Sequence, residues 1–199
     1  MILLVNACIR GEDSRTLLLA RHLLDKLAAK DPVTDTADLV ADPPVPLDSQ
    51  TLALRQSLIE AGDYSHPMMR YARQFAQADT VVVAAPYWDL SFPAALKAYI
   101  EHLCVLGLTF TYNEEDRPVS LCRAKKLYYV TTAGGVIGEH NFGYDYVRSV
   151  MREFFGIRDC EIIMADRLDL VGEDPKELLD KALSRIDTLT CYFLDSGGN

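Results

Sequence analysis

Two large aromatic side chains stand in a loop between a predicted strand and a predicted helix. Tyr87 and Trp88 follow the apolar run Thr80–Ala84, which indicates a buried strand, and precede Lys97–Leu103, which indicates a helix. Pro93 suits the first turn of that helix, where no backbone N–H partner is needed. Such a loop at the carboxyl edge of a parallel sheet offers a flat aromatic surface and backbone amides. We expect it to bind a flat heteroaromatic ligand such as a flavin ring; the alternative is that Trp88 is a core aromatic.

A second candidate site follows the first predicted strand. Ser14 and Thr16 supply hydroxyls at the start of a predicted helix. Arg10 supplies a cation, and Gly11 permits a tight turn. Helix N-terminal amides combined with hydroxyls and an arginine form a phosphate cradle, although Ser14 by itself could serve only as a helix cap. The absence of a G-K-[ST] sequence argues against a Walker loop and against ATP.

A third loop carries two adjacent glycines. Gly134 and Gly135 follow a strand-like run, and residues without a Cβ let the backbone approach a ligand closely. Their amides are suited to bonding the carbonyl edge of a ring, although the segment could also be a flexible turn. His140 and Tyr144 come next, and each is a candidate to face a substrate and to donate a hydrogen bond or proton to it. A solvent-exposed loop position is the alternative for both.

Strands and helices alternate along the chain, and this alternation predicts an α/β fold with a doubly wound, five-stranded parallel sheet and helices on both faces. In such a sheet the three loops described above converge at one edge. The predicted strands are Ile2–Asn6, Thr80–Ala85, Lys126–Thr132 and Cys160–Ala165, with a weaker second or edge strand at Val33–Val40. The predicted helices are Arg15–Ala29, Ser49–Ala61, Met68–Ala78, Ala94–Val105, Tyr144–Phe155 and Pro175–Leu194.

The remaining segments fit inside one domain. Three prolines in Asp42–Pro46 exclude regular structure there, so this stretch is an excursion from the sheet. Leu108–Tyr112 and Arg117–Ser120 alternate in the manner of a short hairpin arm. We therefore expect a single domain over residues 1–195 and a disordered tail over residues 196–199.

Composition restricts the possible function classes. The 199 residues are 49% hydrophobic and carry a net charge of -9, which suits one globular domain with no generic attraction to nucleic acid or anionic membranes. No apolar run approaches the roughly 20 residues of a membrane span. The five cysteines are scattered without a C-x-x-C pair, so we expect neither disulfides nor zinc, and a cytoplasmic location. The four histidines are far apart, so no metal site is expected.

In these loops the chain resembles the flavodoxin-like NAD(P)H:quinone reductases and FMN-dependent azoreductases. The most specific motifs are A-P-x6-P-x-x-L-K-x-Y at Ala85–Tyr99 and G-x-T-F-x-Y at Gly107–Tyr112. The turn at Thr131–Gly135 and the F-x-G-I sequence at Phe154–Ile157 also fit. Each motif is weak by itself, but their order and spacing together are specific, and the resemblance runs from the first strand to Ile157.

The resemblance implies a flavodoxin-like fold, a bound FMN, and NADH or NADPH as a transient co-substrate. It also implies a homodimer in which the partner subunit completes the site, with the region Tyr99–Tyr112 as a candidate interface that could equally be core. The phosphate would lie at Ser14, Arg15 and Thr16 with Arg10 nearby. The ring would lie against Pro86, Tyr87, Trp88, Asp89 and Leu90, with its far edge at Thr132, Ala133, Gly134 and Gly135.

The chain departs from the azoreductase pattern at two positions. Asp89 stands where these enzymes typically have asparagine, and a carboxylate accepts hydrogen bonds but does not donate them unless protonated. It would repel an anionic reduced flavin unless it points elsewhere. Ala133 stands where they have an arginine, which removes a cation near the ring. Both changes bear on azo-dye specificity more than on flavin binding.

The implied activity is two-step, ping-pong hydride transfer from NAD(P)H through the flavin to a quinone, azo compound or similar flat aromatic acceptor. One alternative is a non-enzymatic electron carrier or redox sensor that shares the same loops. A less favoured alternative is a low-molecular-weight tyrosine phosphatase, whose loop reads C-x5-R-[ST]. Here six residues separate Cys8 from Arg15, one more than that motif allows.

Overall fold

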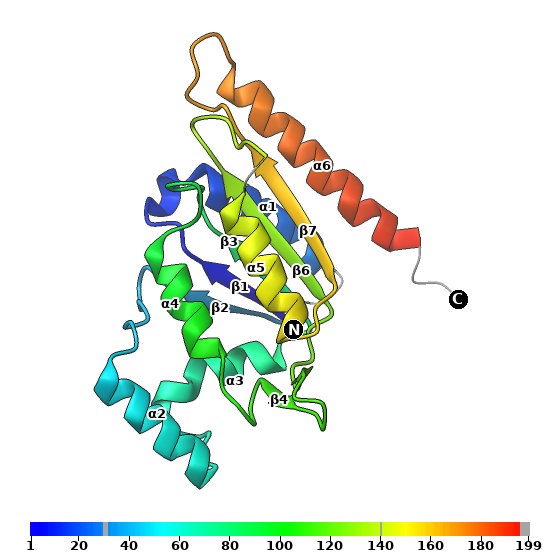
Figure 1. Ribbon diagram of the computed structural model, residues 1–199. Coiled ribbons are helices and arrows are strands. Elements are labelled where there is room, and N and C mark those ends of the chain that lie inside the picture. Colours follow the sequence, from blue (N-terminus) through cyan, green and yellow to red (C-terminus); the bar gives the residue numbers. More distant parts are fainter. Residues whose placement is uncertain (30–31, 140, 196–199) are drawn as a thin grey trace.

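Five parallel strands form the centre of the computed structural model, which describes residues 1–29, 32–139 and 141–195 (Figure 1). They are arranged in the order β2-β1-β3-β6-β7. This order confirms the predicted doubly wound sheet, with Thr34–Asp38 as its edge strand. The strands are β1 (Ile2–Asn6), β2 (Thr34–Asp38), β3 (Thr80–Ala84), β6 (Lys126–Thr132) and β7 (Asp159–Ala165).

The inner strands are apolar because helices cover both of their faces. All five residues of β1 are buried, whereas β2 exposes Thr34, Asp35 and Thr36, and polar or charged residues discourage edge-to-edge pairing. One face packs against α1 (Arg15–Ala28) and α6 (Pro175–Asp195). The other packs against α3 (Arg70–Gln77), α4 (Ala94–Leu103) and α5 (Phe142–Glu153).

The excursion after β2 carries the helix α2 (Ser49–Ala61), which has the predicted bounds. Asp48 and Thr51 form a capping box at its start, and Gly62 ends it with a φ of 66°. Leu58 packs α2 against a small cluster with Met69 of the short 3-10 helix η2 (Pro67–Met69). The excursion is therefore an anchored part of the fold.

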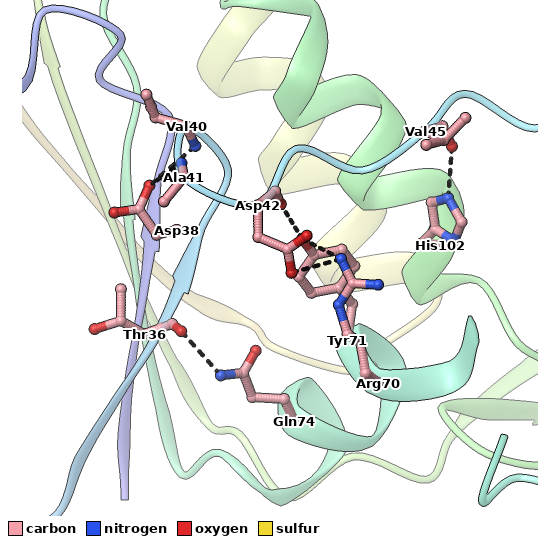
Figure 2. A network of polar contacts seen from close by, with 10 residues as sticks. All are labelled: Thr36, Asp38, Val40, Ala41, Asp42, Val45, Arg70, Tyr71, Gln74 and His102. Atoms are coloured by element: carbon pink, nitrogen blue, oxygen red, sulfur yellow. Dashed lines mark hydrogen bonds and ion pairs between the residues drawn. The ribbon is translucent and has the colours of Figure 1, made fainter. Parts of the chain in front are cut away.

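Side chains of α3 and α4 hold the proline-rich segment in place (Figure 2). Arg70 pairs with the Asp42 carboxylate at 2.7 Å, and the Tyr71 hydroxyl donates to the carbonyl of Asp42. His102 Nε2 lies 2.8 Å from the carbonyl oxygen of Val45. Because the prolines cannot form ladder bonds, these side chains supply the interactions that order the segment.

The hairpin arm is also present, as antiparallel β4 (Phe110–Tyr112) and β5 (Pro118–Ser120). Much of the candidate interface Tyr99–Tyr112 is core, because Tyr99, Ile100, Leu103 and Val105 are buried. Within the described part of the chain, no helix has the length and apolar character to cross a membrane. Residues 196–199, predicted to be disordered, lie outside the described residues.

Candidate functional site

The N-terminus of α1 opens at the carboxyl edge of the sheet, after the short 3-10 helix η1 (Gly11–Asp13). Ser14 caps it, because its Oγ accepts from the Leu17 amide at 3.2 Å and its carbonyl accepts from the Leu18 amide at 3.0 Å. The capping interpretation of Ser14 is therefore confirmed. The amides of Arg15 and Thr16 precede these bonded groups and have no intrahelical acceptor. They give this edge a positive helix end that suits an anion.

Two long-range contacts tie this loop to the far side of the sheet edge. The hydroxyl oxygens of Thr16 and Thr132 lie 2.7 Å apart, and both residues are buried. Arg15 Nη1 lies 2.8 Å from Asp169 Oδ1 in an exposed ion pair. Among the described residues, Arg10 has no ion-pair partner, so its charge is available to a ligand.

The aromatic loop ends in a tight turn. Trp88 and Ser91 exchange two backbone hydrogen bonds of 3.1 and 2.7 Å. Asp89 and Leu90 between them have φ values of 49° and 67°, the left-handed values that a type I′ turn requires. Aspartate tolerates this conformation better than most residues, which gives Asp89 a backbone role independent of any ligand. Trp88 is 43% exposed, so the core alternative for this residue is wrong.

The glycine loop is held by the segment that follows β7. Amides of Asp169 and Arg167 donate to the carbonyls of Gly134 and Gly135 at 2.9 and 2.8 Å. A Cβ added to Gly134 would lie 2.3 Å from Asp169 Oδ2, so the Asp169 carboxylate packs closely over this glycine. These bonds argue against the interpretation of the loop as a flexible turn.

The loops after β1, β3, β6 and β7 together line a cleft of about 290 Å3. Most of the predicted site residues meet there. The lining residues that the sequence predicted are Arg10, Ser14, Arg15, Thr16, Pro86, Tyr87, Trp88, Thr132, Ala133 and Gly134. Asp89, Leu90 and Gly135 were also predicted, but they are not among the lining residues.

Three lining residues were missed by the sequence analysis: Ile9, Leu168 and Asp169. Leu168 and Asp169 follow β7, which was itself predicted as a strand. The rule that loops after parallel strands meet at one edge applies to this loop as well, so the signal was present.

Tyr144 requires a correction. It is buried, its ring packs 5.7 Å from that of Tyr129, and its hydroxyl donates to the carbonyl of Cys160 at 2.9 Å. Burial raises the pKa of this hydroxyl above its ordinary value. Tyr144 therefore faces the sheet, and the prediction that it serves a substrate as a proton donor is withdrawn. His140, the other predicted catalytic residue, lies outside the described residues.

A second cavity of about 600 Å3 lies beside the aromatic loop, which contributes Ser91 and Phe92 to it. The opposite wall is α5, with Phe142 and Tyr146 among its lining side chains. Its aromatic walls suit a flat apolar molecule.

We expect Cys8 to be chemically inert. Its thiol is buried and donates to the carbonyl of Ala84 at 3.5 Å, and burial raises its pKa to about 11. At pH 7.5 almost no thiolate is present, whereas a phosphatase nucleophile requires a lowered pKa. The protein should hydrolyse no p-nitrophenyl phosphate, and Cys8→Ser should leave that result unchanged. Hydrolysis that disappears in Cys8→Ser would revive the phosphatase hypothesis.

Comparisons with known proteins agree with this architecture. A family model described as a flavodoxin-like fold matches residues 1–189. The chain is 45% identical over 125 residues to FMN-dependent NADH:quinone oxidoreductase 2 of Clostridium acetobutylicum, covering 60% of this chain and 62% of that protein. This alignment spans less than two thirds of the length of that relative.

A longer alignment reaches FMN-dependent NADH:quinone oxidoreductase of Coprothermobacter proteolyticus, with 33% identity over 190 residues, 92% of this chain and 94% of that protein. Among solved structures, the azoreductase from Bacillus anthracis superposes with a TM-score of 0.82 at 24% identity, covering 95% of this chain and 97% of that one. That likeness concerns the fold alone. The match over residues 1–189 and the full-length relative show that the chain belongs to the flavodoxin-like family.

Proposed function

We propose that this protein is an FMN-dependent oxidoreductase that passes hydride from NADH, through its bound flavin, to a quinone, azo compound or similar flat aromatic acceptor. The observation that carries the proposal is the cleft, which joins a positive helix end to an exposed indole. NADH is preferred over NADPH because the relatives are named NADH:quinone oxidoreductases.

The residues present fit FMN. At one end the amides of Arg15 and Thr16 supply donors for a phosphate, and Arg10, which has no ion pair with any described residue, supplies charge. At the other end Trp88 offers an exposed aromatic face to a ring system. Between these ends the backbone of Gly134 lines the cleft, where the ring edge would lie.

When bound, FMN supplies the hydride chemistry, and the protein supplies binding, orientation and exclusion of water. Arg10 and the start of α1 would hold the phosphate, and Tyr87 and Trp88 would pack against the ring and shield it from water. The backbone of Gly134, which lines the cleft, would meet the carbonyl edge of the ring. In a ping-pong order, NADH and the acceptor would bind in turn, and the aromatic cavity beside Phe92 would offer the acceptor an apolar wall.

The proposal includes a homodimer in the cytoplasm. Trp88, Leu90 and Phe142 are exposed, apolar and close to the two cavities, which suits cover by a second copy. All five cysteines are free, which suits a reducing compartment.

The decisive measurement is an absorption spectrum of purified protein after addition of FMN, followed by anaerobic NADH. We expect bound flavin bands that NADH bleaches and that a quinone restores, with parallel-line kinetics when both substrates are varied. Riboflavin in place of FMN is the control, because it lacks the phosphate that Arg10 and α1 are proposed to hold, and it should bind more weakly.

Two results would contradict the proposal. Bound flavin that neither NADH nor NADPH can bleach would favour an electron carrier or redox sensor. Failure to take up any flavin would remove the central claim.

A further inference from the structure

We infer that Asp169 is a binding residue for the polyol chain that joins the flavin ring to its phosphate. The inference rests on the proposed binding of FMN. A carboxylate in a cleft for an anionic ligand would repel a phosphate placed next to it. Arg15 donates to one of its oxygens, and the hydroxyls of a ribityl chain are suited to donate to the other.

The position of Asp169 matches the middle of the ligand. Its Oδ1 accepts from Arg15 at the helix end that suits the phosphate, and its Oδ2 occupies the space that a Cβ on Gly134 would take, in the loop that suits the ring edge. The carboxylate thus stands between the two ends of the cleft, where a linking chain has to pass.

Asp169 also has free capacity to accept. Arg15 donates to Oδ1, whereas Oδ2 has no hydrogen-bond donor among the residues that the structure describes. The side chain is 63% exposed, so a ligand can reach it. The Arg15 pair directs the carboxylate toward the cleft, and the bond from the Asp169 amide to the Gly134 carbonyl holds its backbone in place. A carboxylate already held toward the cleft loses less freedom when it binds a hydroxyl than an unpaired one would.

Three flavins separate this role from its alternatives. Lumiflavin has the ring alone, riboflavin adds the polyol chain, and FMN adds the phosphate. Dissociation constants of the wild type, Asp169→Ala and Asp169→Asn are measured by quenching of Trp88 fluorescence. The control is Glu173→Ala, which removes a carboxylate from the same loop outside the cleft lining.

For Asp169→Ala we expect about a tenfold loss of affinity for riboflavin, the equivalent of one charge-assisted hydrogen bond, and a loss for FMN as well. Lumiflavin should change less than about twofold, because it offers the carboxylate no hydroxyl. Asp169→Asn, which keeps an acceptor oxygen, should lose less than Asp169→Ala, and Glu173→Ala should match the wild type.

Unchanged riboflavin binding in Asp169→Ala would overturn the inference, as would tighter binding of FMN alone, which would show simple repulsion of the phosphate. Equal losses for all three flavins would also overturn it, since lumiflavin has no chain to bind. A wild type that binds none of the three would overturn the proposed function together with this inference.

Discussion

Replacing Arg10 with glutamate is expected to weaken FMN binding about 100-fold and to leave riboflavin binding unchanged. Arg15 shares its guanidinium with Asp169, so Arg10 is the cation of the cleft with no competing ion pair in the described chain. Its loss removes a charge-assisted interaction, and the new carboxylate repels the phosphate, together about 3 kcal/mol. The effect should shrink at high salt because the site is exposed.

Trp88 gives a direct readout, since it is the only tryptophan in the chain and lines the cleft. The quenching of Trp88 fluorescence by FMN and by riboflavin is titrated for the wild type and for Arg10→Glu. Arg185→Glu, which makes the same charge change on α6 away from the cleft, controls for net charge. Equal losses for FMN and riboflavin would show that Arg10 does not act on the phosphate, and an unchanged FMN constant would place the phosphate elsewhere.

The sheet and most of the cleft could be predicted because their signals are local. Runs such as Thr80–Ala84 are apolar on both faces, so they mark inner strands, and the carboxyl ends of parallel strands meet at one edge. Hydroxyls and glycines placed just after such runs therefore had to converge. The same rule was not carried to the strand at Cys160–Ala165, and for that reason Asp169 was missed.

Other features have no local signal. The contacts of Thr16 with Thr132 and of Arg15 with Asp169 join residues 116 and 154 positions apart. The turn at Trp88 puts Leu90 in a left-handed conformation that leucine disfavours, so the sequence contains no recognisable turn motif at this position.

The prediction that Tyr144 faces a substrate was wrong for a different reason. α5 begins at Phe142, two residues before the predicted start, because Asn141 caps it by accepting from the Tyr144 amide. Each helical residue turns the side-chain direction by about 100°. The residues that face the second cavity are therefore Phe142, Asp145, Tyr146 and Ser149, and Tyr144 faces the core.

Gly143→Ala should destabilise the protein by about 2 kcal/mol, although alanine is ordinarily the better helix former. An added Cβ would lie 2.9 Å from the Tyr129 hydroxyl and 3.1 Å from the Ser91 carbonyl oxygen. That carbonyl accepts the Trp88 amide and closes the aromatic turn, so the clash should also shift Trp88 emission and weaken FMN binding several-fold. Gly143 thus lets α5 pack closely against the turn that we propose holds the ring.

Tyr129→Phe provides the test of this cause. The Tyr129 hydroxyl is buried and has no hydrogen-bond partner within the described residues, so its removal should cost nothing or stabilise by up to about 1 kcal/mol. In the double variant, the missing hydroxyl relieves one of the two clashes. The loss of unfolding free energy caused by Gly143→Ala should therefore be about half as large as in the Tyr129 background, and the difference is the coupling energy.

Urea unfolding of the four proteins measures that coupling, and Gly138→Ala is the control because its added Cβ meets no atom of the described residues within 4 Å. Strictly additive effects of Gly143→Ala and Tyr129→Phe would show that the hydroxyl does not limit the approach of α5. A loss of stability without any change in Trp88 emission would separate the packing of α5 from the geometry of the aromatic turn. Non-additive effects on stability together with a shifted Trp88 emission would make Gly143 a positioning residue for Trp88. The reason is that the Ser91 carbonyl, which leaves no space for a side chain at position 143, also accepts the Trp88 amide and closes the turn.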